Sequence, residues 1–125
     1  MKKPSRILVI ESTDAAAGRM AALLEQADYS VSIATSSKDA WAALQRRKFD
    51  LIISDLGMPE LSGVTLMQRV RRELPEQNGQ TPAIAMSQYL REEFKAETLN
   101  AGFQSFVIKP AKAERVLLEV RQLLR

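Results

Sequence analysis

Residues 49–59 read Phe49-Asp50-Leu51-Ile52-Ile53-Ser54-Asp55-Leu56-Gly57-Met58-Pro59, a short apolar run joined to a turn-forming loop. The run is nearly continuous, which is typical of a strand buried on both faces of a parallel sheet. The strand is expected to end at Asp55, and the loop after it contains Gly57 and Pro59. The segment therefore predicts a buried strand that carries a carboxylate to one edge of a sheet.

Similar runs recur on both sides of this segment. Residues 6–10, 83–86 and 105–108 are also short and apolar, whereas residues 30–34 alternate and predict a half-buried edge strand. Between the runs, apolar residues are spaced three and four apart, as in helices. Five strands that alternate with five helices predict an α/β fold, with a parallel sheet covered by helices on both faces.

The fourth of these helices is unusual because it has few apolar residues. It is expected from Leu90 to Ala101, with Phe94, Leu99 and Ala101 as its main anchors, and Gly102 is expected to end it in the left-handed region. A helix held by so few apolar contacts should belong to the less stable units of the fold. It is therefore a candidate for a switching surface, although its polar residues also suit an ordinary solvated face.

Composition limits the function classes that remain. The 125 residues suit one domain, taken as residues 1–125 with a core over 6–124, and they include no cysteine and no histidine. Thiol nucleophiles, Ser-His-Asp triads and Cys- or His-based metal sites are thereby excluded. The chain has no apolar run of membrane-spanning length and no signal peptide, so no membrane association and a cytoplasmic location are expected.

The net charge of +3 makes the chain mildly basic. Its densest basic stretches are residues 45–48 and 69–72, and no aromatic residue is interleaved in either. We interpret them as solvated helix faces, and no nucleic-acid partner is expected from this domain.

Polar residues follow four of the five expected strands. Because parallel strands end at one edge of a sheet, these side chains should share that edge, where open α/β sheets place their functional sites. The residues are Glu11, Ser12, Asp55, Ser87 and Lys109.

Carboxylates beside a lysine and a hydroxyl suit phosphoryl chemistry. A carboxylate can act as the nucleophile, oxygen ligands can hold Mg²⁺, and lysine and hydroxyl groups can bind phosphoryl oxygens. The simpler interpretation is that Lys109 pairs with Asp55 and that Ser87 caps the next helix. The joint placement of all these groups favours the phosphoryl site.

The chain resembles the receiver domain of two-component response regulators, of the chemotaxis-regulator type, from Arg6 to Leu124. Five stretches carry the resemblance, at residues 6–11, 49–59, 61–63, 82–87 and 101–110. The resemblance implies a flavodoxin-like fold: a doubly wound, five-stranded parallel sheet in the order 2-1-3-4-5, with five helices and three α/β/α layers. It also implies a signalling domain rather than an enzyme, with at most Mg-dependent self-phosphorylation and autodephosphorylation.

Residue roles follow from the same resemblance. Asp55 matches the phosphoacceptor, which would receive its phosphoryl group from a histidine kinase or phosphotransfer protein. Glu11 and Asp55 match magnesium-positioning carboxylates, and the backbone carbonyl of Gly57 matches a third ligand. Ser87 and Lys109 match the groups that contact the phosphoryl group.

Two further positions match residues of the receiver domain that the family associates with signalling. Phe106 matches an aromatic switch that acts together with Ser87, although core packing explains Phe106 equally well. Lys109-Pro110 matches a peptide bond that is often cis in this family. The expected output surface comprises the fourth helix, the last strand and the last helix, with an unknown downstream protein as its partner.

Ser12 departs from the family pattern, which usually has a second acidic residue there. A neutral hydroxyl attracts Mg²⁺ less than a carboxylate does, so Ser12 is expected to be a weak or absent ligand and magnesium binding to be weak. Asp14 is a poor substitute, because a place in the first turn of a helix already explains it. Gln88, after Ser87, is expected to narrow access to the site.

Three functional hypotheses result. The leading one is a phosphoacceptor receiver domain. The second is a degenerate receiver that binds partner proteins without phosphorylation. The third is a flavodoxin-like binder of a small cofactor or nucleotide, which is less favoured because the chain has no phosphate-cradling glycine loop.

Overall fold

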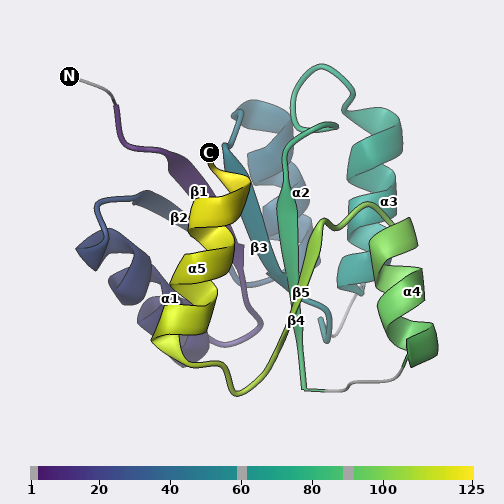
Figure 1. The fold of residues 1–125 in the computed structure, drawn as a ribbon. Helices are drawn as coiled ribbons and strands as arrows, with labels where there is room; N and C mark the ends of the chain where they lie inside the picture. The colour runs from purple at the N-terminus through teal and green to yellow at the C-terminus, as the bar shows by residue number, and fades with distance from the viewer. Residues whose placement is uncertain (1–2, 59–61, 89–91) are drawn as a thin grey trace.

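The computed structural model describes residues 3–58, 62–88 and 92–125. Strands and helices alternate along the described chain (Figure 1). The strands are β1 (Arg6–Ile10), β2 (Ser30–Ala34), β3 (Leu51–Asp55), β4 (Ala83–Ser87) and β5 (Ser105–Ile108). The helices are α1 (Asp14–Gln26), α2 (Ser37–Arg46), α3 (Gly63–Glu73), α4 (Glu92–Asn100) and α5 (Ala113–Leu123). Pro59, Leu61 and Leu90, which the sequence analysis uses, lie outside the described residues.

The five strands form one parallel sheet in the order β2-β1-β3-β4-β5. This arrangement confirms the predicted doubly wound fold and the edge position of residues 30–34. The order reverses between β1 and β3, so α1 and α5 cover one face of the sheet while α2, α3 and α4 cover the other (Figure 1). Among the described residues, no helix combines the length and apolar character needed to cross a membrane.

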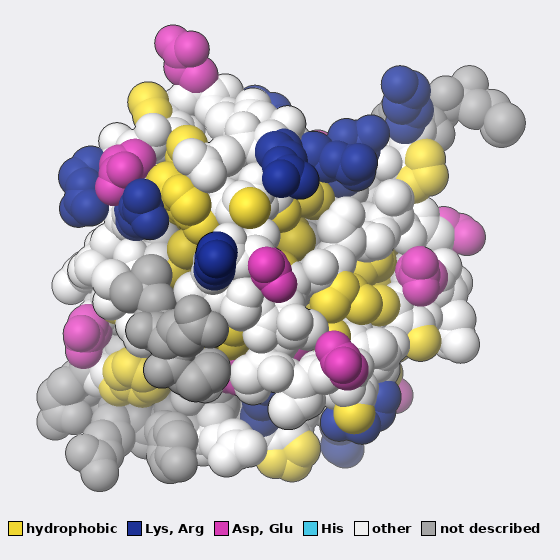
Figure 2. All heavy atoms as spheres, turned by 180° about the vertical axis from the view of Figure 1, so that it is seen from behind, with side chains coloured by type: hydrophobic (Ala, Val, Ile, Leu, Met, Phe, Trp, Pro, Cys, Tyr) yellow, Lys and Arg dark blue, Asp and Glu magenta, His cyan; other side chains and the backbone are white. Residues whose placement is uncertain are grey.

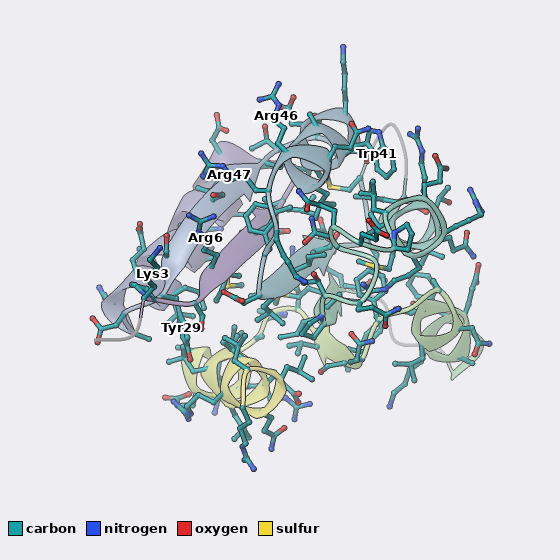
Figure 3. All side chains as sticks on the ribbon, turned by 90° about the horizontal axis from the view of Figure 1, so that it is seen from above. Lys3, Arg6, Tyr29, Trp41, Arg46 and Arg47 are labelled. Atoms are coloured by element: carbon teal, nitrogen blue, oxygen red, sulfur yellow. The ribbon has the colours of Figure 1, made fainter. Side chains whose placement is uncertain are left out.

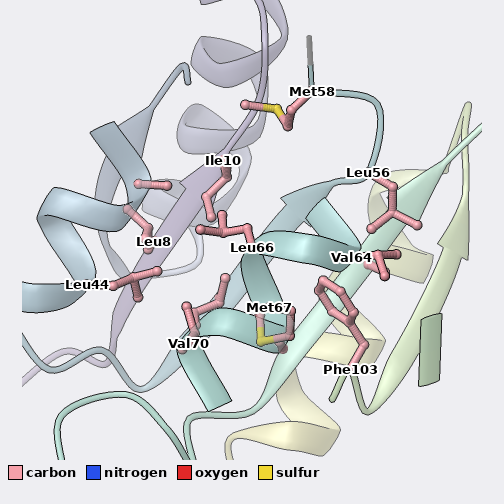
Figure 4. Close-up of a cluster of buried hydrophobic side chains, with 14 of the residues drawn as sticks. Leu8, Ile10, Leu44, Leu56, Met58, Val64, Leu66, Met67, Val70 and Phe103 are labelled. Atoms are coloured by element: carbon pink, nitrogen blue, oxygen red, sulfur yellow. The ribbon is translucent and has the colours of Figure 1, made fainter. Parts of the chain in front are cut away.

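Each face of the sheet has its own hydrophobic core, because successive side chains of a strand point to opposite faces. Leu8, Ile10 and Ile52 pack against α2 and α3, and Figure 4 shows the part of this cluster built around Leu66, Met67 and Val70. Ile7, Val9, Leu51, Ile53 and Ile84 pack on the opposite face against α1 and α5, with Leu24, Val116 and Val120. Burial on both faces explains why β1, β3 and β4 are continuous apolar runs.

Helix α4 confirms one part of its prediction and corrects another. Phe94 is partly buried and Ala101 is buried against the core, as expected. Leu99, however, is 41% exposed, and Thr98 is fully buried in its place. The Thr98 hydroxyl donates a hydrogen bond to the Phe94 carbonyl at 2.8 Å, and this bond allows a polar side chain to face the core.

The turn after α4 has the backbone that the sequence predicts. Gly102 has φ of +119° and lies against the Arg71 side chain. The Arg71 guanidinium donates to the carbonyls of Gly102, Asn78 and Gly79, at distances between 2.8 and 3.2 Å. Arg71 therefore ties the end of α4 to the loop between α3 and β4.

Candidate functional site

The predicted site residues meet at the carboxyl edge of the sheet. Glu11 follows β1, Asp55 is the last residue of β3, Ser87 is the last of β4, and Lys109 follows β5. Backbone hydrogen bonds hold these strand ends in place: Leu56 donates to the Met86 carbonyl at 3.0 Å, and Lys109 donates to the Ser87 carbonyl at 2.8 Å. The parallel register therefore positions the groups side by side, as the sequence predicts.

The Lys109 ammonium group lies between the two carboxylates of this edge. Its Nζ atom is 2.7 Å from Oε1 and 2.9 Å from Oε2 of Glu11, and 3.7 Å from Oδ1 of Asp55. The ion pair with Glu11 is thus the closer of the two, whereas the simpler sequence interpretation pairs Lys109 with Asp55 alone. A cation within reach of both carboxylates reduces the repulsion between them.

Glu11 is the more buried of the two carboxylates, with 6% of its side chain exposed against 16% for Asp55. Burial raises the pKa of Glu11, because the charged form loses hydration. The hydrogen bond and charge of Lys109 act in the opposite direction, and the nearby charge of Asp55 adds to the increase. Burial therefore disfavours the charged form of Glu11, and its pairing with Lys109 partly offsets that effect.

Asp55 faces an open hollow of about 770 Å³ above this edge. Its Oδ1 atom accepts a hydrogen bond from the Gly57 N–H at 3.3 Å, so the loop after β3 folds back over the carboxylate. A Cβ atom at Gly57 would lie 4.0 Å from both Asp55 carboxylate oxygens. Glycine at this position therefore places no side chain of its own beside the Asp55 carboxylate.

Comparison with known proteins agrees with this fold and this edge. The family model described as the response regulator receiver domain matches residues 7–121. The chain belongs to the receiver-domain family of response regulators.

Similarity to individual proteins spans nearly the whole chain. An uncharacterised 14.6 kDa protein of Leptolyngbya boryana is 36% identical over 117 residues, which cover 93% of this chain and 87% of that protein. The chemotaxis protein CheY4 of Vibrio cholerae is 26% identical, with a TM-score of 0.90 over 97% of this chain and 99% of that one. The receiver domain of the sensor histidine kinase PA1611 of Pseudomonas aeruginosa, determined with a magnesium ion in its active-site cleft, has the same fold (21% identity, TM-score 0.87, 97% and 98% covered).

Several curated relatives are longer than this receiver. The chain spans 25% of the regulatory protein LuxO of Vibrio cholerae and 49% of the regulator RpaA of Synechocystis, at 27% and 31% identity. The similarity to these proteins therefore concerns only part of their length.

The oxygen donors of the receiver fit a magnesium ion in part. Mg²⁺ is commonly held by one or two carboxylates together with waters and phosphate oxygens, and Glu11 and Asp55 supply two carboxylates. Within the described ranges, no group of three or more acidic, histidine or cysteine side chains could hold a metal ion. Ser12 is exposed at the rim of the hollow, and Asp14 begins α1 as an exposed residue. Among the described residues, this edge therefore offers two carboxylates, Glu11 and Asp55, as possible magnesium ligands.

The remaining predicted residues lie around the same edge. Ser87 is buried, and Gln88 is exposed and lines the hollow, as its predicted role in narrowing access requires. Phe106 is partly buried and meets Phe94 of α4 edge-to-face, with 6.3 Å between the ring centres. The Lys109-Pro110 peptide bond is cis, as the resemblance implies.

Sequence reasoning missed the wall of the hollow that α1 supplies. Ala16, Arg19, Met20 and Leu23 of α1 line it opposite Ala113 and Val116 of α5. Their three- and four-residue spacing marks one face of a helix and could have identified them. This wall gives the site an apolar approach from the side of α1.

Proposed function

We propose that this receiver domain accepts a phosphoryl group on Asp55 from a phosphohistidine of a histidine kinase or phosphotransfer protein. The observation that carries the proposal is the position of Lys109 Nζ, 2.7 Å from Glu11 and 3.7 Å from Asp55, beside a carboxylate that faces open space. This arrangement provides a nucleophile, and a cation for the phosphoryl oxygens that gain charge during transfer. Phosphorylation and magnesium are typical of the family to which the chain belongs.

In the proposed transfer, a carboxylate oxygen of Asp55 attacks the phosphorus atom. The bond between phosphorus and the donor nitrogen breaks, and its electron pair returns to the imidazole. Lys109 binds a phosphoryl oxygen, and the Ser87 hydroxyl donates a hydrogen bond to another. Magnesium, when held by Glu11, Asp55 and the Gly57 carbonyl, would neutralise charge on the transferring group.

The proposed output is the α4-β5-α5 face. Among the described residues, four large apolar side chains are exposed. Leu99, Ile108 and Leu118 lie on these three elements, at 41 to 44% exposure, and Ile33 lies on β2 instead. Exposed apolar residues gathered on neighbouring elements are typical of a protein-binding surface. Phe106 connects this face to the site, because it lies on β5 near Lys109 and contacts Phe94 of α4. A hydrogen bond from Ser87 to the phosphoryl group would leave space toward which Phe106 can turn.

The second candidate is a degenerate receiver that binds its partners without phosphorylation. Ser12 favours this second candidate, because it adds no carboxylate to Glu11 and Asp55 at the carboxyl edge of the sheet. Lys109 also already contacts both oxygens of Glu11. Asp55, Ser87 and Lys109 favour the first candidate, because a binding module has no need of all three at one edge.

The deciding experiment is intact-mass spectrometry after incubation with acetyl phosphate, with and without excess magnesium. The phosphoacceptor proposal expects a magnesium-dependent gain of one phosphoryl group, which Asp55→Asn abolishes. Ser12→Asp should lower the magnesium concentration needed for half-maximal modification. The absence of any gain in the folded wild-type domain, together with a gain in Ser12→Asp, would establish the degenerate receiver instead.

A further inference from the structure

Two basic segments that are distant in sequence meet at the edge of the sheet opposite the phosphorylation site. Arg6 begins β1, and its backbone N–H donates to Asp50 Oδ2 at 2.7 Å, while the Asp50 N–H donates to the Arg6 carbonyl at 2.8 Å. The segment that contains Lys3 and Arg6 therefore lies beside the end of α2. We name the exposed cations of these segments the basic edge: Lys3, Arg6, Arg46, Arg47 and Lys48.

The cations of the basic edge have no carboxylate partner in the described part of the chain. The ion pairs of the described residues are formed by other cations, namely Arg69, Arg72, Lys109 and Arg115. The carboxylates nearest in sequence are Asp50 and Glu11. Asp50 already accepts the Arg6 backbone N–H, and Glu11 pairs with Lys109. Figure 2 shows Lys and Arg side chains gathered along the upper part of the molecule, where the strands begin. The five positive charges of the basic edge outnumber the net charge of +3 of the whole chain, so positive charge is concentrated at this edge.

Two aromatic side chains lie at the ends of this row. Figure 3, which looks onto the edge, shows Tyr29 beside Lys3 and Arg6, and Trp41 beyond Arg46 and Arg47. Tyr29 directly precedes β2, and the backbone bond from Ser30 to the Ser5 carbonyl places it next to the N-terminal segment. Both aromatic side chains are partly exposed. Arg69 covers one face of Trp41, with Cζ 3.8 Å from the ring centre. Trp41 and Tyr29 also pack against the hydrophobic cores of the sheet, so only the exposed part of each ring is available to a ligand.

We propose that the basic edge binds the phosphate backbone of a single-stranded nucleic acid. Guanidinium groups form paired hydrogen bonds with phosphate, and three of the five cations are arginines. Aromatic rings beside a cationic row provide surfaces on which unpaired bases stack, which favours a single strand over a duplex. The sequence-based expectation of no nucleic-acid partner relied on the lack of aromatic residues within the basic stretches, and the fold brings Tyr29 and Trp41 to them. This binding is independent of the proposed phosphorylation of Asp55.

The test uses fluorescence anisotropy of the full chain with labelled oligothymidylate and oligouridylate of about 12 nucleotides. We expect weak binding, with a Kd on the order of 10⁻⁵ M, that falls with salt by a logarithmic slope of about −3, as four phosphate contacts on a single strand require. The double variant Arg46→Glu with Arg47→Glu should weaken binding at least about tenfold at low salt. Asp55→Asn should bind as the wild type does, which separates this proposal from the phosphoacceptor proposal.

A matched control carries the same charge change elsewhere. Lys95→Glu with Lys112→Glu alters the net charge equally but lies on α4 and at the start of α5, and it should leave the Kd within about twofold. Quenching of Trp41, the single tryptophan, by the unlabelled oligonucleotide provides a second readout. Equal loss in both double variants would overturn the proposal, because overall charge would then explain the binding. Tighter binding to a duplex, or binding to anionic vesicles or an acidic peptide but not to either oligonucleotide, would also overturn it.

Discussion

The loop between α3 and β4 depends on one buried amide, and its removal should cost much of the stability of the fold. Asn78 is fully buried. Its Nδ2 group donates to the carbonyls of Leu44 and Arg47, both at 2.7 Å, and its Oδ1 atom accepts from the Phe49 N–H at 2.9 Å and from the Thr81 hydroxyl at 3.0 Å. Asn78 thus satisfies backbone groups where α2 ends and where the chain turns into β3.

The expected magnitude follows from the groups that lose a partner in Asn78→Ala. Thr81 keeps its hydrogen bond to the Phe49 carbonyl at 3.1 Å, and exposed Arg47 can turn its carbonyl to water. The Leu44 carbonyl and the Phe49 N–H remain buried without a partner, at about 1–3 kcal/mol each. We therefore expect the free energy of unfolding to fall by about 2–6 kcal/mol, a large part of the 5–15 kcal/mol typical of a domain.

A charged variant tests the hydrogen-bond argument separately from side-chain volume. In Asn78→Asp, a carboxylate oxygen replaces the donor and faces two carbonyl oxygens, so at neutral pH the loss should equal or exceed that of alanine. Burial raises the pKa of such a carboxyl. The loss should therefore shrink as the pH falls through that raised pKa, because the protonated acid can donate one hydrogen bond again.

The assay is urea unfolding followed by the fluorescence of Trp41, with circular dichroism as a second probe. Gln80→Ala, in the same loop but exposed, is the matched control and should change the stability by less than about 0.5 kcal/mol. A loss below about 1 kcal/mol for Asn78→Ala, at an unchanged denaturant slope, would refute the reasoning. Wild-type stability of Asn78→Asp at neutral pH would refute it as well.

Three other substitutions have defined outcomes in the same unfolding assay. Gly102→Ala should cost about 1–3 kcal/mol, because φ is +119° there and the new Cβ atom would lie 2.7 Å from Arg71 Cγ; no loss would mean that the turn adjusts freely. Ser36→Ala should cost about 1 kcal/mol, because its hydroxyl accepts from the Asp39 N–H at the start of α2, and Ser36→Thr should retain most of that stability. Burial raises the pKa of Glu11, so its carboxyl weakens the fold as the pH rises from the unfolded-state pKa through the folded-state pKa. Glu11→Gln should make the stability less dependent on pH in the range just above the ordinary carboxyl pKa. An unchanged dependence would contradict the raised pKa.

The strands and their order along the chain could be predicted, because a strand that is buried on both faces has a continuous apolar sequence. The runs that become β1, β3 and β4 are apolar at nearly every position, and the polar residue after each run marks the edge of the sheet. Once the sheet is parallel, Glu11, Asp55 and Lys109 must lie together. The sequence could not show which carboxylate Lys109 approaches more closely, because that choice depends on side-chain distances within one edge.

Other features could not be predicted because they depend on contacts between distant segments. Helix α4 has too few apolar residues to define a face, so Leu99 was expected to be an anchor although Thr98 occupies the buried position. Asn78 lies in a polar segment that resembles any surface loop, and its burial arises from the end of α2. The basic edge likewise exists only because the start of β1 lies beside residues 47–50.

The charges at the carboxyl edge of the sheet determine what the serine at position 12 means for function. Glu11 and Asp55 are the two carboxylates of this edge, and Lys109 lies within reach of both, so we expect the resting edge to attract a divalent cation only weakly. An incoming phosphoryl group carries negative charge of its own and would draw Lys109 toward it, which frees the oxygens of Glu11. Magnesium and the phosphoryl group should therefore bind cooperatively, and each should raise the affinity for the other by the same factor. Weak metal binding by the resting domain is thus compatible with efficient phosphorylation, so the rate of Asp55 modification, rather than the resting magnesium affinity, distinguishes a working receiver from a degenerate one.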